Sequence, residues 1–246
     1  MRFRIDLQPY TRAYTLPYDY QYKLAVAIYK LFSAGNEQFG KWLHDKGMGE
    51  RRYKMFTFSK LYFDRMKPGR KGLECFGGAF FYFSTINNND YAQAMLKGVF
   101  KSKNLYLGNY QFQIAGIKPM PEVELKETQK YSMLSSSVAS KLNIYDSVDY
   151  LTPERSDIES ALENNLLNKY RILHGQEYTG NLKITLDKDY FFKHNSTKLH
   201  RIKNIKVKSF ICPLTIQGGI EIHKLAYSAG IGEKNAMGYG IIKEAG

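Results

Sequence analysis

Hydrophobic periodicity changes along the first half of the chain in an order that few folds accommodate. Residues 2–8 alternate apolar and charged side chains, as a half-buried strand does, whereas residues 20–32 space their apolar side chains as a helix does. The later predicted elements are strands at 54–63 and 79–86, a helix at 91–101 with an N-cap cluster at 87–90, and a strand at 106–117. Apart from a short extra helix at 37–44, this is the βαββαβ order of a ferredoxin-like domain.

The second half of the chain follows a proline-rich segment, 118–121, and predicts a similar unit. Its predicted elements are a strand at 138–144, a helix at 154–173, strands at 182–186 and 205–214, a helix at 219–228 and a strand at 239–243. No direct sequence repeat relates the halves, so the duplication rests on element order alone. We predict an α+β protein of two tandem ferredoxin-like (RRM-like) domains, 1–119 and 120–246.

The charge distribution indicates a polyanionic partner. The 246 residues include 36 Lys and Arg against 23 Asp and Glu, a net charge of +13. Residues 41–71 hold ten basic and three acidic residues, residues 181–210 hold eight and two, and the remainder holds 18 of each. A basic surface that served only solubility would spread this excess, so the clustering favours a groove for nucleic acid.

Composition excludes several other classes. Hydrophobic residues make up 43% and charged residues 24%, ordinary values for a globular chain with a buried core. No apolar run approaches the roughly 20 residues of a membrane helix, and the first residues lack a secretory signal. Cys75 and Cys212 are too few for a disulfide scaffold. We therefore expect a cytoplasmic protein. Four histidines lack the spacing of metal ligands, namely His174, His194, His200 and His223. We therefore expect no metal and no cofactor.

The segment from Gly230 to Gly240 reads GIGEKNAMGYG, two Gly-X-Gly pairs separated by five residues that include Lys234. Glycines permit positive φ and close approach of a ligand, and N–H groups in such a loop can hold phosphates. No Gly-Lys-Ser/Thr ends it, and a strand follows where a Rossmann motif needs a helix. A phosphate-binding loop and a tight loop packed against a sheet both remain compatible with the pattern.

The position of this segment, between the last helix and the last strand, resembles the glycine-rich loop of the CRISPR repeat-processing endoribonucleases of the RAMP superfamily. Four N-terminal blocks look like that family's in the same order, namely MRFRIDLQP, LPYDYQYKLAVAIY, LHD and KMFTFS. Residues 111–181 carry no match. The resemblance implies two ferredoxin-like domains and metal-independent cleavage of CRISPR precursor RNA within its repeats. It makes repeat RNA the expected partner and other CRISPR effector subunits candidate partners, and it leaves the oligomeric state open.

Three residues match the family's catalytic pattern: Tyr29, His44 and Lys54. RNA cleavage without a metal requires 2'-OH deprotonation, stabilisation of the phosphorane and protonation of the 5'-oxygen, and it leaves 2',3'-cyclic phosphate and 5'-OH ends. We expect His44 to be general acid or base, Lys54 to stabilise the phosphorane and Tyr29 to orient or deprotonate the 2'-OH, with the direction of proton flow open. Without the resemblance, the three would equally suit a surface histidine, a core aromatic and a solvated lysine.

Basic residues interleaved with apolar ones near residue 200 suit a track for RNA phosphates. Together with the glycine segment they make up the expected RNA-binding set: Lys198, Arg201, Lys203, Lys206, Lys208, Gly230, Gly232, Lys234, Gly238 and Gly240. The run FFYF at residues 80–83 could stack bases as in other RNA-binding ferredoxin-like sheets, but a central strand favours core packing.

Two other functions remain open. A non-catalytic RNA-binding subunit of a CRISPR interference complex would need the charge and the glycine segment but not His44. An unrelated single-strand-binding protein would explain the charge but not the glycine segment.

Overall fold

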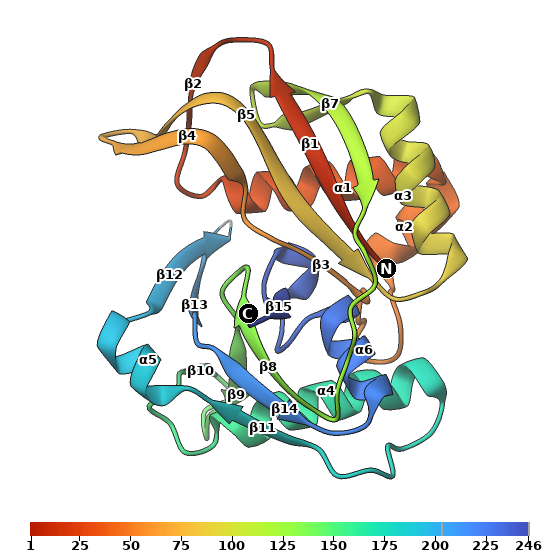
Figure 1. Cartoon of the computed structure of the whole chain (residues 1–246), viewed down its shortest axis with the longest axis vertical. Coiled ribbons are helices and arrows are strands. Elements are labelled where there is room, and N and C mark those ends of the chain that lie inside the picture. The colour runs from red at the N-terminus through yellow and green to blue at the C-terminus, as the bar shows by residue number, and fades with distance from the viewer. Residues whose placement is uncertain (203, 246) are drawn as a thin grey trace. The chain divides into compact units, whose positions relative to one another are not determined.

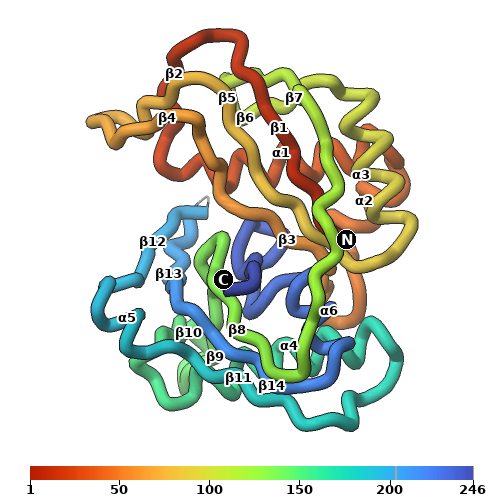
Figure 2. The backbone as a smooth tube through the Cα atoms, in the orientation of Figure 1, coloured from red at the N-terminus to blue at the C-terminus, as the bar shows by residue number. Residues whose placement is uncertain are grey.

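The structure, a computed structural model, describes residues 1–202 and 204–245. The predicted RNA-binding residue Lys203 lies outside this described part. The chain divides into two compact units: unit 1 is Met1–Gly47 with Phe58–Glu122, and unit 2 is Met48–Thr57 with Val123–Gly246. Each unit has its own antiparallel sheet, and the path of the chain through both can be followed in Figures 1 and 2.

Unit 1 is a ferredoxin-like domain with extra edge elements. In chain order it contains β1 (Arg2–Pro9), β2 (Ala13–Leu16), α1 (Tyr20–Gly35), α2 (Glu37–Asp45), β4 (Tyr62–Gly69), β5 (Gly72–Thr85), α3 (Asn89–Ser102), β6 (Asn104–Leu107) and β7 (Tyr110–Pro119). Strand β5 lies between β4 and β1, and β7 pairs with the other edge of β1. This is the ferredoxin strand order, which the first half of the sequence predicts. The short β3 (Phe56–Phe58) runs across the boundary between the units in the sequence.

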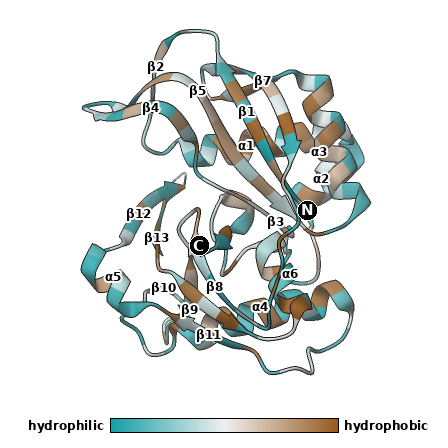
Figure 3. Cartoon of the chain, in the orientation of Figure 1, coloured by the Kyte–Doolittle hydropathy of each residue, from teal (hydrophilic) through white to brown (hydrophobic). Residues whose placement is uncertain are grey.

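Side-chain alternation explains which face of the unit 1 sheet is core. Figure 3 shows the alternation along β1, where Ile5 is fully buried between charged neighbours. The FFYF run divides in the same way, because Phe81 and Phe83 are fully buried while Phe80 and Tyr82 lie half-buried on the opposite face. There the Phe80 ring stacks on Tyr62 with centroids 5.0 Å apart.

Asparagine caps set the starts of two helices in unit 1. Asn36 Oδ1 accepts a hydrogen bond from Phe39 N at 3.0 Å at the start of α2, and Asn88 Oδ1 accepts one from Asp90 N at 2.8 Å at the start of α3. The N-cap cluster expected at 87–90 is therefore confirmed. Helices α1 and α3 approach closely, since a Cβ on Gly98 would lie 1.9 Å from the Leu31 carbonyl oxygen.

Unit 2 is a second ferredoxin-like domain with two inserted hairpins. Its elements are β8 (Thr128–Met133), β9 (Ala139–Leu142), β10 (Val148–Leu151), α4 (Ile158–His174), β11 (Lys183–Leu186), α5 (Lys188–His194), β12 (Thr197–Ile202), β13 (Ile205–Phe210), β14 (Leu214–Gln217), α6 (Ile220–Ala229), a short 3₁₀ turn (Asn235–Met237) and β15 (Ile242–Glu244). The sheet order β11-β14-β8-β15 gives βαββαβ topology, with β9–β10 and β12–β13 as the insertions. The predicted α+β class of two tandem ferredoxin-like domains is confirmed.

Two strand predictions in unit 2 were wrong in detail. The first strand of the sheet is β8, whereas the strand predicted at 138–144 is the hairpin strand β9. The single strand predicted at 205–214 is two strands, because the chain leaves β13 before Pro213, which has no N–H for a ladder, and enters β14 after it.

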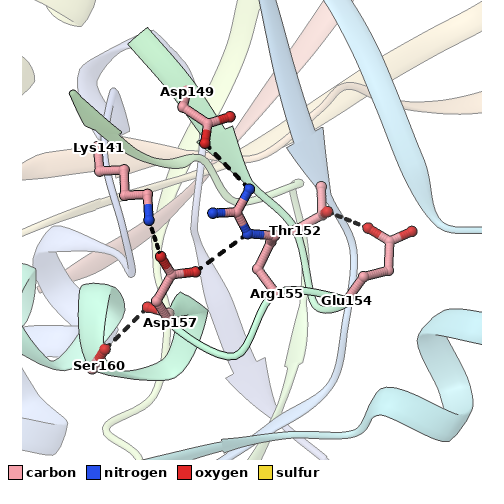
Figure 4. A network of polar contacts seen from close by, with 7 residues as sticks. All are labelled: Lys141, Asp149, Thr152, Glu154, Arg155, Asp157 and Ser160. Carbon is pink, nitrogen blue, oxygen red and sulfur yellow. Dashed lines mark hydrogen bonds and ion pairs between the residues drawn. The ribbon is translucent and has the colours of Figure 1, made fainter. Parts of the chain in front are cut away.

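A polar network explains why α4 begins at Ile158 and not at residue 154, as the periodicity predicts. Figure 4 shows Asp157 paired with Lys141 of β9 and with Arg155, whose Nη1 lies 3.2 Å from Asp149 Oδ2 of β10. Thr152 also bonds Glu154. These contacts hold residues 152–157 in a turn that joins the β9–β10 hairpin to the start of α4.

No helix in the described part of the chain has the length and apolar character to cross a membrane.

The thiols of Cys75 and Cys212 are both buried. Burial raises the pKa of Cys75 to about 11 and the pKa of Cys212 to about 12. Neither thiol is therefore ionised to a useful extent near neutral pH.

Candidate active site

Tyr29 and His44 lie against each other in unit 1. Tyr29 is near the end of α1 and His44 near the end of α2, and the single residue Asn36 between these helices turns α2 back onto α1. Their ring centroids are 5.8 Å apart and the ring planes meet at 82°, an edge-to-face contact. The structure thus brings together two of the three expected catalytic residues.

The two rings differ in their surroundings. The His44 side chain is 74% exposed, and its Nδ1 lies 2.8 Å from Asp45 Oδ1. Burial raises the pKa of Tyr29 above its ordinary value of 10.0. Tyr29 therefore stays neutral at physiological pH and can donate its O–H, but it is a poor base. The pair places an exposed imidazole ring beside a neutral hydroxyl donor.

Lys54 belongs to unit 2, in the segment Met48–Thr57. Met48 N bonds Tyr53 O at 2.7 Å and Tyr53 N bonds Met48 O at 2.9 Å, which closes a tight turn before Lys54. Arg52 and Met55 have positive φ values of 53° and 50°. Such conformations are strained for residues with a side chain and persist where the surrounding structure imposes them, often at functional sites.

The glycine segment needs glycine for its own packing. All four of its glycines have positive φ, and their values are 83° at Gly230, 72° at Gly232, 86° at Gly238 and 73° at Gly240. A Cβ on Gly240 would lie 1.9 Å from the Ile231 carbonyl oxygen, and one on Gly232 would lie 2.3 Å from that of Val138. Lys234 is the exposed residue of the segment, so its side chain is accessible to a ligand.

The β12–β13 hairpin carries the expected basic track. Arg201 and Lys206 are directly opposite in the register, and Lys208 is opposite Leu199 on the same face. Like charges directly opposite each other in a sheet destabilise it, and a bound polyanion relieves this cost. Lys198 lies on the other face with His200, whose ring meets Tyr239 of the glycine segment edge-on at 5.4 Å. Burial and Lys198 lower the pKa of His200.

The described residues contain no cluster of three or more His, Cys, Asp or Glu side chains able to hold a metal ion. His223 is fully buried and bonds the Tyr131 hydroxyl through Nδ1 at 2.8 Å, as a core histidine does.

The structure adds two residues that the sequence reasoning missed. Lys169 of α4 is 2% exposed and bonds carbonyl oxygens of the glycine segment, and Asn235 bonds the same segment from within. The signal for Lys169 was its place in the helix, because it follows Ile158, Leu162 and Leu166 on the buried face. A lysine on an apolar helical face requires buried acceptors.

Two ferredoxin-like domains and a C-terminal glycine-rich loop agree with the architecture that the resemblance to CRISPR repeat-processing endoribonucleases implies. A sequence model described as "CRISPR-associated protein Cas6, N-terminal" matches residues 15–118, and one described as "CRISPR associated protein Cas6, C-terminal" matches residues 118–244. The chain belongs to the Cas6 family of CRISPR-associated proteins.

Relatives and solved structures agree with this assignment. The chain is 29% identical to the CRISPR-associated endoribonuclease Cas6 1 of Methanocaldococcus jannaschii, over 97% of this chain and 91% of the relative. It is 28% identical to the CRISPR-associated endoribonuclease Cas6 of Pyrococcus furiosus, over 100% and 90%. A solved structure titled "CRISPR associated protein Cas6" superposes with a TM-score of 0.82 at 26% identity, covering 100% of this chain and 99% of the other. The predicted class, an endoribonuclease, is confirmed at the level of the family.

Proposed function

We propose that this protein cleaves CRISPR precursor RNA within its repeats by attack of a 2'-OH on the adjacent phosphate, without a metal ion. The products are a 2',3'-cyclic phosphate and a 5'-OH. The observation that carries the proposal is the contact between Tyr29 and the exposed ring of His44, from consecutive helices of unit 1. The names of the relatives support CRISPR RNA as the substrate.

Each of the three residues has a role in this reaction. His44 transfers a proton, and its Nδ1 contact to Asp45 favours the tautomer in which Nε2 exchanges the proton with RNA. Tyr29, which is neutral at physiological pH, orients the 2'-OH by hydrogen bonding. Lys54 supplies a fixed positive charge to the phosphorane.

RNA binding in this proposal uses the hairpin face of Arg201, Lys206 and Lys208 together with the exposed Lys234 of the glycine segment. A bound RNA phosphate near the opposed cations of the hairpin would relieve their mutual repulsion, which the fold leaves unscreened.

A substrate with one 2'-deoxy nucleotide just upstream of the cut tests the mechanism. The deoxy RNA should bind as tightly as the ribose RNA and remain uncut, because it lacks only the attacking oxygen. The control is an RNA with the same substitution two nucleotides away, which should be cleaved normally. Cleavage of the first substrate, or a rate that is lost with EDTA and restored by Mg²⁺, would overturn the proposed chemistry. Tight repeat binding with no cleavage of any substrate would identify a non-catalytic RNA-binding subunit instead.

A further inference from the structure

Lys169 of α4 ends in a cage of acceptors provided by the glycine segment. Its Nζ donates hydrogen bonds to Gly230 O at 2.8 Å, to Gly232 O at 2.8 Å and to Asn235 Oδ1 at 2.7 Å. An ammonium has three N–H groups, so these three bonds satisfy the charged form completely. The side chain is 2% exposed, so water does not compete for these bonds.

Asn235 extends this cage across the glycine segment. While its Oδ1 accepts from Lys169, its Nδ2 donates to Ile231 O at 3.2 Å and to Tyr239 O at 3.0 Å. Ile231 N also bonds Gly240 O at 2.8 Å. Lys169 and Asn235 therefore tie both Gly-X-Gly pairs to a single point on α4.

A buried lysine ammonium stabilises a fold less than a buried apolar side chain would. Burial lowers the pKa of Lys169 to about 7, and Glu233 partly opposes this shift. Between pH 7 and 10.5, the ordinary pKa of lysine, the unfolded chain therefore binds this proton more readily than the folded chain. The free energy of unfolding thus increases as the pH rises through this range. Below pH 7 the folded protein carries the full cost of a buried ammonium, a cost that a buried apolar side chain avoids.

We propose that Lys169 is a positioning residue that fixes the glycine segment in its RNA-binding shape. This inference rests on the proposed function, because it assumes that the glycine segment contacts RNA. Lys169 does not touch RNA in this scheme. It acts through the carbonyl groups of Gly230 and Gly232, which precede the exposed Lys234, and through the side chain of Asn235, which follows it.

The test compares Lys169→Met with Lys224→Met in the full-length protein. Methionine has a similar length and no charge, and Lys224 is an exposed lysine on α6, the helix that leads into the glycine segment. Three measurements are made on each: backbone amide NMR shifts of the glycine segment without RNA, affinity for repeat RNA, and single-turnover cleavage at saturating RNA.

For Lys169→Met we expect shifted and broadened amide signals throughout residues 230–240. We also expect RNA affinity to fall by about tenfold or more, the effect of losing one charge-assisted hydrogen bond between the glycine segment and RNA. The rate at saturating RNA should stay within about twofold, since the Tyr29–His44 contact is untouched. Lys224→Met should match wild type in all three. A residue needed only for stability would lower the unfolding temperature without this separation of affinity from rate.

A second variant keeps the test decisive if Lys169→Met does not fold. Asn235→Ala removes one of the three acceptors and both amide donors, and it should change the same amides with a smaller loss of affinity. Unchanged amides in a folded variant would overturn the inference. Changed amides with wild-type affinity would support the shaping role of Lys169 within the segment but would overturn the assignment of the segment as an RNA contact, a failure of the proposed function.

Discussion

At the scale of single residues, the difference between Tyr29 and His44 decides how a pair of neighbouring rings can act. The His44 side chain is exposed, whereas burial raises the pKa of the Tyr29 hydroxyl, which stays protonated near neutral pH and can act as a hydrogen-bond donor. The protein offers an internal comparison, because the rings of His194 and Tyr190 on α5 also contact each other, with centroids 4.4 Å apart and planes tilted by 42°. The ring contact of Tyr29 and His44 therefore supports the catalytic assignment in combination with the match of both residues to the family's motifs.

The variant His44→Ala should lower the single-turnover rate by about 10²-fold or more and leave repeat affinity nearly unchanged, since loss of general acid or base catalysis costs about 10² to 10⁴. His194→Ala is the matched control and should retain the wild-type rate. Equal rates for His44→Ala and wild type would remove His44 from the mechanism.

The variant Tyr29→Phe should lower the rate less, by about tenfold, because it keeps the ring contact and loses one oriented hydroxyl. A tyrosine with a raised pKa does not ionise between pH 6 and 9, so the shape of the pH–rate profile should not change. Tyr14→Phe, which alters another buried tyrosine of unit 1 with a raised pKa, should have no effect on the rate. Loss of a basic limb in the Tyr29→Phe profile would show instead that Tyr29 is the base.

At the scale of elements, hydrophobic periodicity predicted the amphipathic helices and strands but not the element bounds that a few polar contacts determine. The helices α1, α2, α3 and α6 and the strand β11 lie within a few residues of their predicted bounds. The start of α4 depends on Asp157 and its partners, and β8 has no clear alternation to reveal it, since its burial varies irregularly along the strand. At the site, Tyr29, His44 and Lys54 came from matched motifs, whereas Lys169 is recognised only when its helical face and the glycine segment are seen together.

The variant Gly240→Ala should destabilise the protein more than Gly175→Ala does. Both glycines have positive φ, 73° and 70°, but a Cβ meets the Ile231 oxygen at 1.9 Å in the first and nothing within 4 Å in the second. A positive φ at an alanine alone costs about 1 kcal/mol of stability, and the forced displacement of packed backbone adds roughly 1–3 kcal/mol. Denaturant unfolding of both variants measures the difference, and equal losses would mean that the segment relaxes without strain.

Replacing Lys206 and Lys208 together by alanine should weaken binding to any RNA sequence. Each lost phosphate contact removes about 0.7 from the slope of log affinity against log salt on a single strand, so the slope should fall by about 1.4. The double variant of the exposed Lys193 and Lys224 controls for net charge. If repeat RNA is affected and a scrambled RNA is not, these lysines read bases and not phosphates.

At the scale of the whole molecule, the candidate catalytic residues are distributed between two separately packed folds. Tyr29 and His44 belong to unit 1, and Lys54 belongs to unit 2 through the segment Met48–Thr57, which is inserted in sequence between two parts of unit 1. The sequence-based boundary at residue 119 could not foresee this, because the segment is assigned to a unit by its tertiary contacts and not by its position along the chain.

The two buried thiols make the protein suitable for site-specific spectroscopy. With pKa values raised to about 11 and about 12, Cys75 and Cys212 expose almost no thiolate to an alkylating reagent at pH 7. A cysteine introduced at an exposed position such as Lys193 would therefore be labelled selectively in the otherwise unaltered chain. A fluorophore or spin label placed in this way can report the arrival of RNA in real time, without first removing the native cysteines and the packing that they provide.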